Sequence, residues 1–394
     1  MNAKRQYLSY GRQSVDEEDI AAVAMALRGE FLTTGPKVEE FESDFARATG
    51  AAHTIACNSG TAALHLAALA LDLAPGDAAI VPTVTFLATA NIVRMAGAEV
   101  VFADVDPDTG LLTPDMLCAA IQRATAKGLR PKVALPVHLC GQVCDMTELA
   151  AVAGASGIAF IEDACHSLGV ANIGATQHSS AACFSTHAVK AITTGEGGVV
   201  TTADAAVAAR IRRLRNHGIV RDPKAFENRA LAFDGADANP WYYEMMEVGW
   251  NYRLADVLCA LGISQLKKLG NFWRRRVAIA SLYDRLLASL APTLRPVPHG
   301  DRPHAWHLYT VLIDFKALGK TRASVMRTLH SQGIGTQVHY IPVHQQPYYR
   351  RRYGTFALPG ADAFYAGCLS LPIFPAMSDD DVRRVADALA AIFR

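Results

Sequence analysis

Lys190 lies in a short glycine-rich stretch between two apolar segments. It follows the hydroxyl group of Ser185 by five residues and precedes the turn Gly195-Glu196-Gly197-Gly198. A lysine amine that is partly removed from water loses its proton more readily and can then react with an aldehyde to form a Schiff base. Most lysines are solvated surface residues, so a covalent role for Lys190 requires partner groups elsewhere in the chain.

An acid and an aromatic residue follow two other apolar runs. Asp163 comes directly after the run Ile158 to Glu162, which predicts a buried strand that ends at the carboxyl edge of a sheet. A carboxylate at that edge can keep a pyridine nitrogen protonated, and a helix N-cap is the competing interpretation of Asp163. Phe86 also follows a predicted strand and could stack on a ring, although a core aromatic is the commoner fate of a phenylalanine.

A turn suited to an anion occurs near the start of the chain. Asn58-Ser59-Gly60-Thr61 separates the predicted strand Thr54 to Ala56 from an alanine- and leucine-rich helical segment. The first N–H groups of a helix have no partner within the helix and attract anions. Gly60 allows close approach of the backbone, and the hydroxyl groups of Thr61 and Ser185 can add donors. A plain capping turn is the alternative interpretation of the same residues.

The amine, the acid, the aromatic face and the anion cradle are the groups that pyridoxal 5′-phosphate (PLP) requires of a protein. Along the chain they appear in the order cradle, aromatic, acid, hydroxyl and lysine, each at or just after the end of a predicted strand. Their joint occurrence favours a PLP enzyme over the separate structural interpretations. A Rossmann-type nucleotide-binding protein is disfavoured, because no G-x-G-x-x-G motif follows the first strand.

Strand and helix patterns alternate through the first two thirds of the chain, which predicts a largely parallel α/β sheet covered on both faces. The predicted strands are Thr54 to Ala56, Ala78 to Val81, Glu99 to Ala103, Lys132 to Val137, Gly157 to Ile161, Ala181 to Ser185 and Gly198 to Thr202. We expect a large domain over residues 1–255, with an N-terminal arm, and a small domain over 256–394. The small domain should contain strands at Thr310 to Ile313 and Thr336 to Tyr340 and a closing helix from Ser378.

Composition excludes several classes of partner. The 38 Lys and Arg nearly balance the 37 Asp and Glu of the 394 residues, so we expect no nucleic-acid or membrane partner. The most apolar helix-like run, Ala62 to Ala74, is too short to span a bilayer. The eight cysteines are scattered without two ligand-spaced pairs, and the segment Met1 to Gln6 is polar, so we expect no metal site and a cytoplasmic protein.

The chain resembles the DegT/DnrJ/EryC1/StrS sugar aminotransferases. The matching stretches are Leu32 to Pro36, Asn58 to Leu64, Glu162 to Gly169, the Lys190 segment, His217 to Ile219 and Gly249 to Arg253. The resemblance implies fold type I of the PLP-dependent transferases, which is aspartate aminotransferase-like. In that fold a large domain with a mostly parallel seven-stranded sheet is joined to a smaller C-terminal α+β domain.

The same resemblance assigns roles to individual residues. It implies that Lys190 binds the cofactor covalently and that Asp163 pairs with the pyridinium nitrogen. It also implies that His166 approaches the ring hydroxyl, that Phe86 stacks on the ring, and that Asn251 reaches the phosphate in the neighbouring subunit of a homodimer. This chain departs from the family at Thr186, where an aromatic residue usually precedes the histidine.

Within the family, three segments most resemble the members that serve pseudaminic acid biosynthesis: His187 to Thr194, His217 to Pro223 and Trp241 to Glu244. The resemblance implies amino transfer from L-glutamate to C4 of a UDP-linked 4-keto-6-deoxy-N-acetylhexosamine. Gly35, His187, Arg253, His339 and Tyr340 are candidate substrate contacts. Half-buried histidines, and an ion pair of Arg253 with Asp256 or Glu247, are the competing interpretations.

Three alternatives remain open at this stage. The acceptor could be another nucleotide-linked keto-sugar, aminated at C3 or C4. A PLP-dependent sugar dehydratase on the same scaffold is disfavoured, because family members with that chemistry have histidine in place of Lys190. A non-catalytic PLP-binding regulator is disfavoured by the presence of Lys190, Asp163, Ser185 and Asn251 together.

Overall fold

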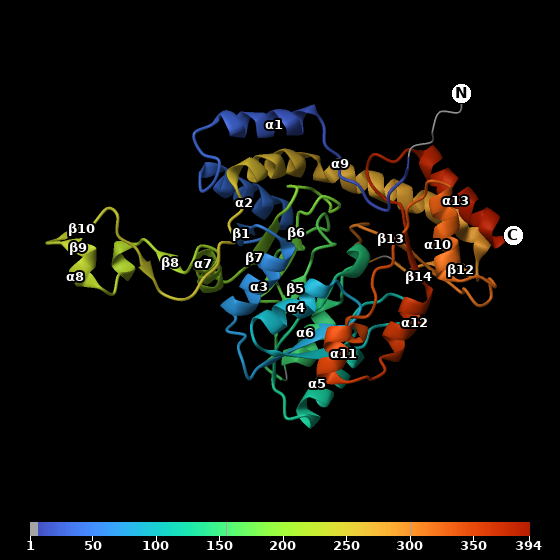
Figure 1. Ribbon diagram of the computed structural model, residues 1–394, viewed down its shortest axis with the longest axis horizontal. Helices are drawn as coiled ribbons and strands as arrows, with labels where there is room; N and C mark the ends of the chain where they lie inside the picture. The colour runs from blue at the N-terminus through green and yellow to red at the C-terminus, as the bar shows by residue number, and fades with distance from the viewer. Residues whose placement is uncertain (1–6, 155, 301) are drawn as a thin grey trace.

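A seven-stranded sheet forms the centre of the molecule (Figure 1). The computed structural model describes residues 7–154, 156–300 and 302–394. The strand order is β1-β7-β6-β5-β4-β2-β3, and only β7 runs antiparallel to its neighbours. The strands are β1 (His53–Cys57), β2 (Ala78–Pro82), β3 (Glu99–Ala103), β4 (Pro131–Ala134), β5 (Ala159–Asp163), β6 (Ala181–Ser185) and β7 (Gly198–Thr202). All seven strands predicted from the sequence are confirmed, as is the mostly parallel α/β sheet.

Helices pack on both faces of this sheet and link its strands (Figure 1). They are α1 (Glu17–Arg28), α2 (Pro36–Thr49), α3 (Gly60–Ala70), α4 (Leu87–Met95), α5 (Pro114–Ala126), α6 (Met146–Gly154) and α7 (Ala205–Leu214). Four of these helices are preceded by an N-cap residue whose side-chain oxygen accepts from a backbone N–H of the first turn: Asp16, Ser59, Thr113 and Asp204. The alternation of strand and helix therefore brings the strand ends, and the polar residues that follow them, to one edge of the sheet.

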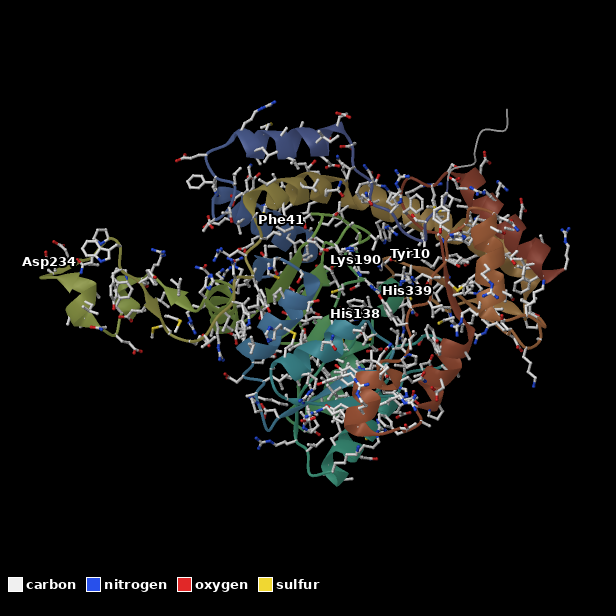
Figure 2. The ribbon with its side chains drawn as sticks, in the orientation of Figure 1. Tyr10, Phe41, His138, Lys190, Asp234 and His339 are labelled. Carbon is white, nitrogen blue, oxygen red and sulfur yellow. The ribbon has the colours of Figure 1, made fainter. Side chains whose placement is uncertain are left out.

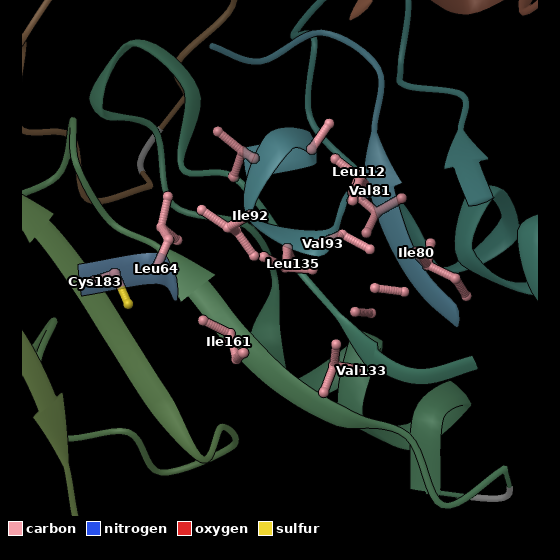
Figure 3. Close-up of a cluster of buried hydrophobic side chains, with 14 of the residues drawn as sticks. Leu64, Ile80, Val81, Ile92, Val93, Leu112, Val133, Leu135, Ile161 and Cys183 are labelled. Carbon is pink, nitrogen blue, oxygen red and sulfur yellow. The ribbon is translucent and has the colours of Figure 1, made fainter. Parts of the chain in front are cut away.

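The main hydrophobic core lies between the sheet and its covering helices (Figure 3). Ile80, Val133 and Ile161 project from three neighbouring strands, while Leu64 and Ile92 come from α3 and α4. Every residue of β2 is buried, as expected of a parallel strand covered on both faces. This packing fixes the strand ends that carry the site.

The C-terminal part has its own core. It is built on an antiparallel sheet of β12 (Leu294–Pro296), β13 (Tyr309–Ile313) and β14 (Cys368–Leu371), covered by α10 (Arg322–Ser331) and α13 (Asp379–Phe393). The long helix α9 (Asp256–Leu287) packs on α1 and α2 and also on α13. Because α9 contacts both parts, the boundary between residues 255 and 256 stays a prediction. The shorter helices α11 (Pro347–Tyr353) and α12 (Pro359–Gly367) complete this region.

One predicted element of the small domain is wrong. Residues 336–340, expected as a strand, make only an isolated bridge between Gln337 and Ser370. The two strands that pair with β13 are instead β12 and β14, which the sequence did not reveal. The apolar and aromatic residues of 336–340 follow a strand-like pattern because they face a cavity rather than a neighbouring strand.

An arm projects from the large sheet (Figure 1). It contains β8 (Ile219–Val220), α8 (Arg229–Ala232), β9 (Phe233–Asp234), β10 (Asp237–Ala238) and β11 (Glu244–Met245), and it was not predicted as a separate element. None of the helices in the described ranges combines the length and the apolar character needed to cross a bilayer. The polar segment Met1 to Gln6 lies outside the described residues.

Candidate active site

A cavity of about 610 Å³ opens at the carboxyl ends of β1, β5 and β6 and is closed on the other side by residues 337–341. Figure 2 shows Lys190, Tyr10 and His339, which all line it, near the middle of the molecule, whereas Asp234 lies out on the arm. Ten of the predicted site residues line the cavity: Gly60, Thr61, Phe86, Asp163, His166, Ser185, His187, Lys190, His339 and Tyr340.

The loop that carries Lys190 is tied at its base. The N–H of Thr186 donates to the carbonyl of Gly197, and the hydroxyl groups of Thr186 and Thr194 lie 2.6 Å apart. A Cβ on Gly197 would come within 2.3 Å of both hydroxyl oxygens, so only glycine fits there. In this chain, Thr186 thus replaces the expected aromatic side chain with a buried hydroxyl pair that closes the loop.

Desolvation favours the neutral form of the Lys190 amine. Desolvation lowers the pKa of its ammonium group, while the negative charges that Cys165 and Asp163 can carry oppose the shift. Its backbone N–H donates to the carbonyl of His187 at 2.9 Å, which holds the turn. The amine can therefore lose its proton at a lower pH than a solvated lysine and is suited to nucleophilic attack and to proton transfer.

Asp163 is the last residue of β5, and its backbone is fixed by the neighbouring segment 136–138. Its N–H donates to the carbonyl of Pro136, and its own carbonyl accepts from the N–H of His138. One carboxylate oxygen, Oδ2, accepts from the hydroxyl of Thr89 at 2.7 Å. The other, Oδ1, accepts from the N–H of Cys165 at 3.2 Å. Both oxygens are thus oriented, which suits an acid that must hold one ring nitrogen.

The start of α3 forms the anion cradle. Ser59 caps the helix by accepting from the N–H of Ala62 at 3.1 Å, which leaves the N–H groups of Gly60 and Thr61 for another acceptor. A Cβ on Gly60 would lie 2.9 Å from the Cβ of Ser185, so glycine allows the two segments to meet. Ser185 accepts from the N–H of His187 at 3.3 Å, and its own hydroxyl hydrogen is available to a ligand.

His166 is held in one neutral form. Its Nδ1 accepts from the N–H of Cys140 at 3.2 Å, so the ring proton sits on Nε2, which lies 3.3 Å from the hydroxyl oxygen of Tyr340. Desolvation lowers the pKa of His166, with the charges of Lys190 and His339 adding to the effect. His166 therefore donates to Tyr340 and cannot supply a positive charge.

The remaining cavity residues differ in exposure. Phe86 lines the cavity, is 56% exposed, and lies 6.0 Å from Tyr340 between ring centroids. His339 is buried, its Nδ1 lies 2.8 Å from the hydroxyl of Ser370, and burial lowers its pKa to about 3. His187 lies at the mouth, 3.9 Å from the carboxylate of Glu196.

Three predicted site residues lie outside this cavity. The N–H of Gly35 donates to Asp256 at 2.8 Å, which anchors the start of α2. Arg253 donates to the side-chain oxygen of Asn216 at 2.5 Å and forms neither of the ion pairs considered from the sequence. Asn251 is exposed beside that segment, and its carbonyl accepts from Asn58 at 3.4 Å. Their predicted roles at the substrate or at a neighbouring subunit stay predictions.

Sequence reasoning missed several residues of the site. Thr89 donates to Asp163 and lies 2.7 Å from the hydroxyl of Thr85, and Thr85 lines the cavity together with Tyr10, Cys165, Glu196 and Gln337. The spacing of Thr85 and Thr89, one helical turn apart around the predicted stacking residue, was the available signal. No equivalent spacing marks Tyr10, because residues 7–10 reach the cavity through backbone hydrogen bonds with distant residues, those of Leu8 with Gly333 and Gly335 and that of Tyr10 with Ile373.

PLP fits the residues of this cavity. An unpaired helix N-terminus and a serine hydroxyl can hold the phosphate, an oriented carboxylate can hold the ring nitrogen, and a lysine with a lowered pKa is near. Fold and site together define a PLP-dependent aminotransferase of fold type I. Residues 13–390 match the model of the DegT/DnrJ/EryC1/StrS aminotransferase family, and the chain belongs to that family.

Known relatives agree with this assignment. The spore coat polysaccharide biosynthesis protein SpsC of Bacillus subtilis is 39% identical over 99% of this chain and 98% of its own length. PseC of Helicobacter pylori, an aminotransferase involved in the biosynthesis of pseudoaminic acid, superposes with a TM-score of 0.87. It is 28% identical, and the match covers 98% of this chain and 99% of PseC. The PLP form of the sugar aminotransferase Spr1654 of Streptococcus pneumoniae gives a TM-score of 0.85 at 26% identity, over 98% of both chains.

Proposed function

We propose that this aminotransferase moves an amino group from L-glutamate to C4 of a UDP-linked 4-keto-6-deoxy-N-acetylhexosamine, on the route to pseudaminic acid. The observation that carries the chemistry is the convergence of Lys190, Asp163 and the start of α3 on one cavity. The likeness to PseC over 98% of the chain supports the acceptor. The balanced charge and a cavity of about 610 Å³ are consistent with a cytoplasmic enzyme that acts on a small soluble substrate.

In this proposal the chain's residues divide the work. PLP, when bound, supplies a ring that withdraws electrons from the carbon that loses or gains a proton. Asp163 holds the ring nitrogen, Phe86 covers one ring face, and His166 with its fixed tautomer meets the ring hydroxyl. The first N–H groups of α3 with the hydroxyls of Thr61 and Ser185 hold the phosphate. Lys190, whose pKa is lowered by desolvation, accepts and returns the proton in each half of the transfer.

Substrate contacts and the second subunit complete the proposal. His187, His339 and Tyr340 face the keto-sugar from the cavity wall. Gly35, Arg253 and Asn251 lie outside the cavity of one protomer, and we propose that they act at the cavity of a neighbouring subunit in a homodimer. An Asn251→Ala variant that retains the wild-type affinity for PLP would remove this assignment for Asn251.

The sequence similarity to SpsC favours a second candidate acceptor sugar. SpsC is more similar in sequence to this chain than PseC is, and its name places it in spore coat polysaccharide biosynthesis. A different nucleotide-linked keto-sugar, aminated at C3 or C4, is therefore the alternative substrate.

The test is a two-step titration of the purified, PLP-loaded protein. L-glutamate should bleach the visible cofactor band, and only an acceptor sugar should restore it. UDP-linked 4-keto sugars that differ at C5, and the matching TDP-linked compounds, are compared as acceptors. Restoration by the UDP-linked 4-keto-6-deoxy-N-acetylhexosamine supports the proposal, while restoration only by another keto-sugar identifies the alternative.

A further inference from the structure

Two buried threonines connect the aromatic and the acid of the site. Thr85 and Thr89 lie on either side of Phe86, the residue that precedes α4, and both threonine side chains are buried, with exposures of 1% and 0%. Their hydroxyl oxygens lie 2.7 Å apart, and that of Thr89 lies 2.7 Å from Oδ2 of Asp163. The Thr89 hydroxyl therefore lies next to both Asp163 and the backbone carbonyl of Phe86, the residue expected to cover the ring.

The direction of these hydrogen bonds follows from donor counting. Thr89 has one hydroxyl hydrogen and three oxygen neighbours: Asp163, Thr85 and the carbonyl of Phe86 at 3.3 Å. An ionised carboxylate only accepts, and a bond from a hydroxyl to a charged oxygen is stronger than one to a neutral oxygen. The hydrogen of Thr89 therefore goes to Asp163, and the hydrogen of Thr85 goes to Thr89.

We infer that Thr89, supported by Thr85, is a positioning residue of the reaction: the two hydroxyls form a one-way relay that orients the Asp163 carboxylate toward the cofactor ring. This inference rests on the proposed function, in which Asp163 holds the ring nitrogen. Thr89 does not line the cavity, so it acts through Asp163 rather than on a ligand.

The surroundings explain why a threonine suits this place. Oδ1 of Asp163 is already held by the N–H of Cys165, so Thr89 supplies the second anchor and leaves the remaining lone pairs toward the cavity. A β-branched side chain has a restricted first torsion, which fixes the hydroxyl without further partners. The backbone N–H of Thr89 also donates to the carbonyl of Phe86, so a displaced Thr89 would move Phe86 and Asp163 together.

The experiment measures the affinity of the apoprotein for PLP by fluorescence titration, together with the pH dependence of the visible band of the loaded protein. We expect Thr89→Val to weaken PLP binding by about tenfold to a hundredfold, because a hydrogen bond to a charged group is lost. Thr89→Ser, which keeps the hydroxyl, should restore most of the affinity. Thr85→Val should cost about threefold, since it removes only the supporting bond.

Two controls separate positioning from a structural role. Thr54→Val also removes a buried hydroxyl, one that donates to the carbonyl of Glu42 away from the cavity, and it should destabilise the apoprotein without changing PLP affinity. In an Asp163→Asn background, Thr89→Val should have little further effect, because the two residues act as one unit.

The outcomes distinguish a failure of the hydroxyl relay from a failure of the proposed role of Asp163. If Thr89→Val binds PLP as tightly as wild type, or if Thr89→Ser is as weak as Thr89→Val, the relay is wrong. If Asp163→Asn itself leaves the affinity and the visible band unchanged, the proposed role of Asp163 fails instead. If Thr89→Val keeps the wild-type affinity for PLP while Asp163→Asn loses affinity, the relay is wrong and the proposed function stands.

Discussion

The two walls of the cavity are built differently. The sheet wall consists of residues at strand and helix ends, and backbone N–H groups donate to its polar side chains Asp163 and Ser185. In the opposite wall, residues 337–341, the backbone of Gln337 pairs with that of Ser370, and Nδ1 of His339 lies 2.8 Å from the Ser370 hydroxyl oxygen. The first wall thus has its geometry set by the sheet, whereas the second has its geometry set by packing.

The walls also differ in charge. Lys190 and Asp163 supply ionisable groups that respond to each other on the sheet wall. On the opposite wall burial lowers the pKa of His339 to about 3 and raises that of Tyr340, so both groups are neutral near pH 7. We therefore expect the sheet wall to determine cofactor binding and chemistry, and the opposite wall to determine which sugar fits.

The strongest test of this division removes the amine. Lys190→Ala should lower turnover by about 10³-fold or more, because covalent and proton-transfer chemistry is lost. The visible absorption of the lysine-bound cofactor should also disappear, while circular dichroism and the unfolding midpoint stay near wild type. Turnover close to wild type in this variant would remove Lys190 from the mechanism.

The same amine should show its lowered pKa in a pH profile. Only the neutral amine reacts with the aldehyde of PLP, so the rate with which apoprotein takes up PLP should rise with pH. Because burial lowers the pKa of Lys190 from its usual value of 10.5, the midpoint should fall below that of Nα-acetyl-lysine measured in parallel. A midpoint equal to that of the free amine would contradict the desolvation argument.

Filling the anion cradle should have an intermediate effect. Gly60→Ala places a Cβ 2.9 Å from Ser185 and 3.3 Å from the sulfur of Cys165, and such overpacking costs about 1–3 kcal/mol. PLP affinity should fall by about tenfold, as measured by equilibrium titration of the apoprotein. Gly154→Ala, where nothing lies within 4 Å of the added carbon and the backbone φ is not positive, controls for the loss of a glycine.

A change on the opposite wall should affect the sugar and spare the cofactor. Tyr340→Phe removes the hydroxyl that accepts from Nε2 of His166 at 3.3 Å. We expect kcat/KM for the acceptor sugar to fall by about threefold to tenfold, the worth of one hydrogen bond. PLP affinity should not change. A loss of cofactor affinity without an effect on the sugar would reverse the assignment of the two walls.

The smallest effect should come from the base of the Lys190 loop. Thr186→Val breaks the hydroxyl pair with Thr194, which also donates to the carbonyl of Glu196 at 2.8 Å. The free energy of unfolding should fall by about 1 kcal/mol, measured by denaturant titration, with Thr54→Val as the matched buried hydroxyl. If PLP affinity fell more than stability did, the pair would belong to the cofactor site rather than to the loop.

The sequence predicted most of the sheet wall for a physical reason. Parallel strands are read from short apolar runs, and the residue after each run must reach the carboxyl edge, so Asp163, Ser185 and Gly60 were placed by local pattern. Helix caps such as Ser59 are also local signals. The family resemblance added roles for these residues, and the match over residues 13–390 confirms the family itself.

Tertiary structure alone decided the rest. Residues 336–340 have a strand-like pattern, yet they line a cavity, because β14 took the place beside β13. The hydroxyl relay from Thr85 to Asp163 joins residues that are far apart in the chain, and its direction depends on distances that no local pattern encodes. Propensity and periodicity report short-range geometry, whereas the partner of a buried polar group is chosen by packing between distant segments.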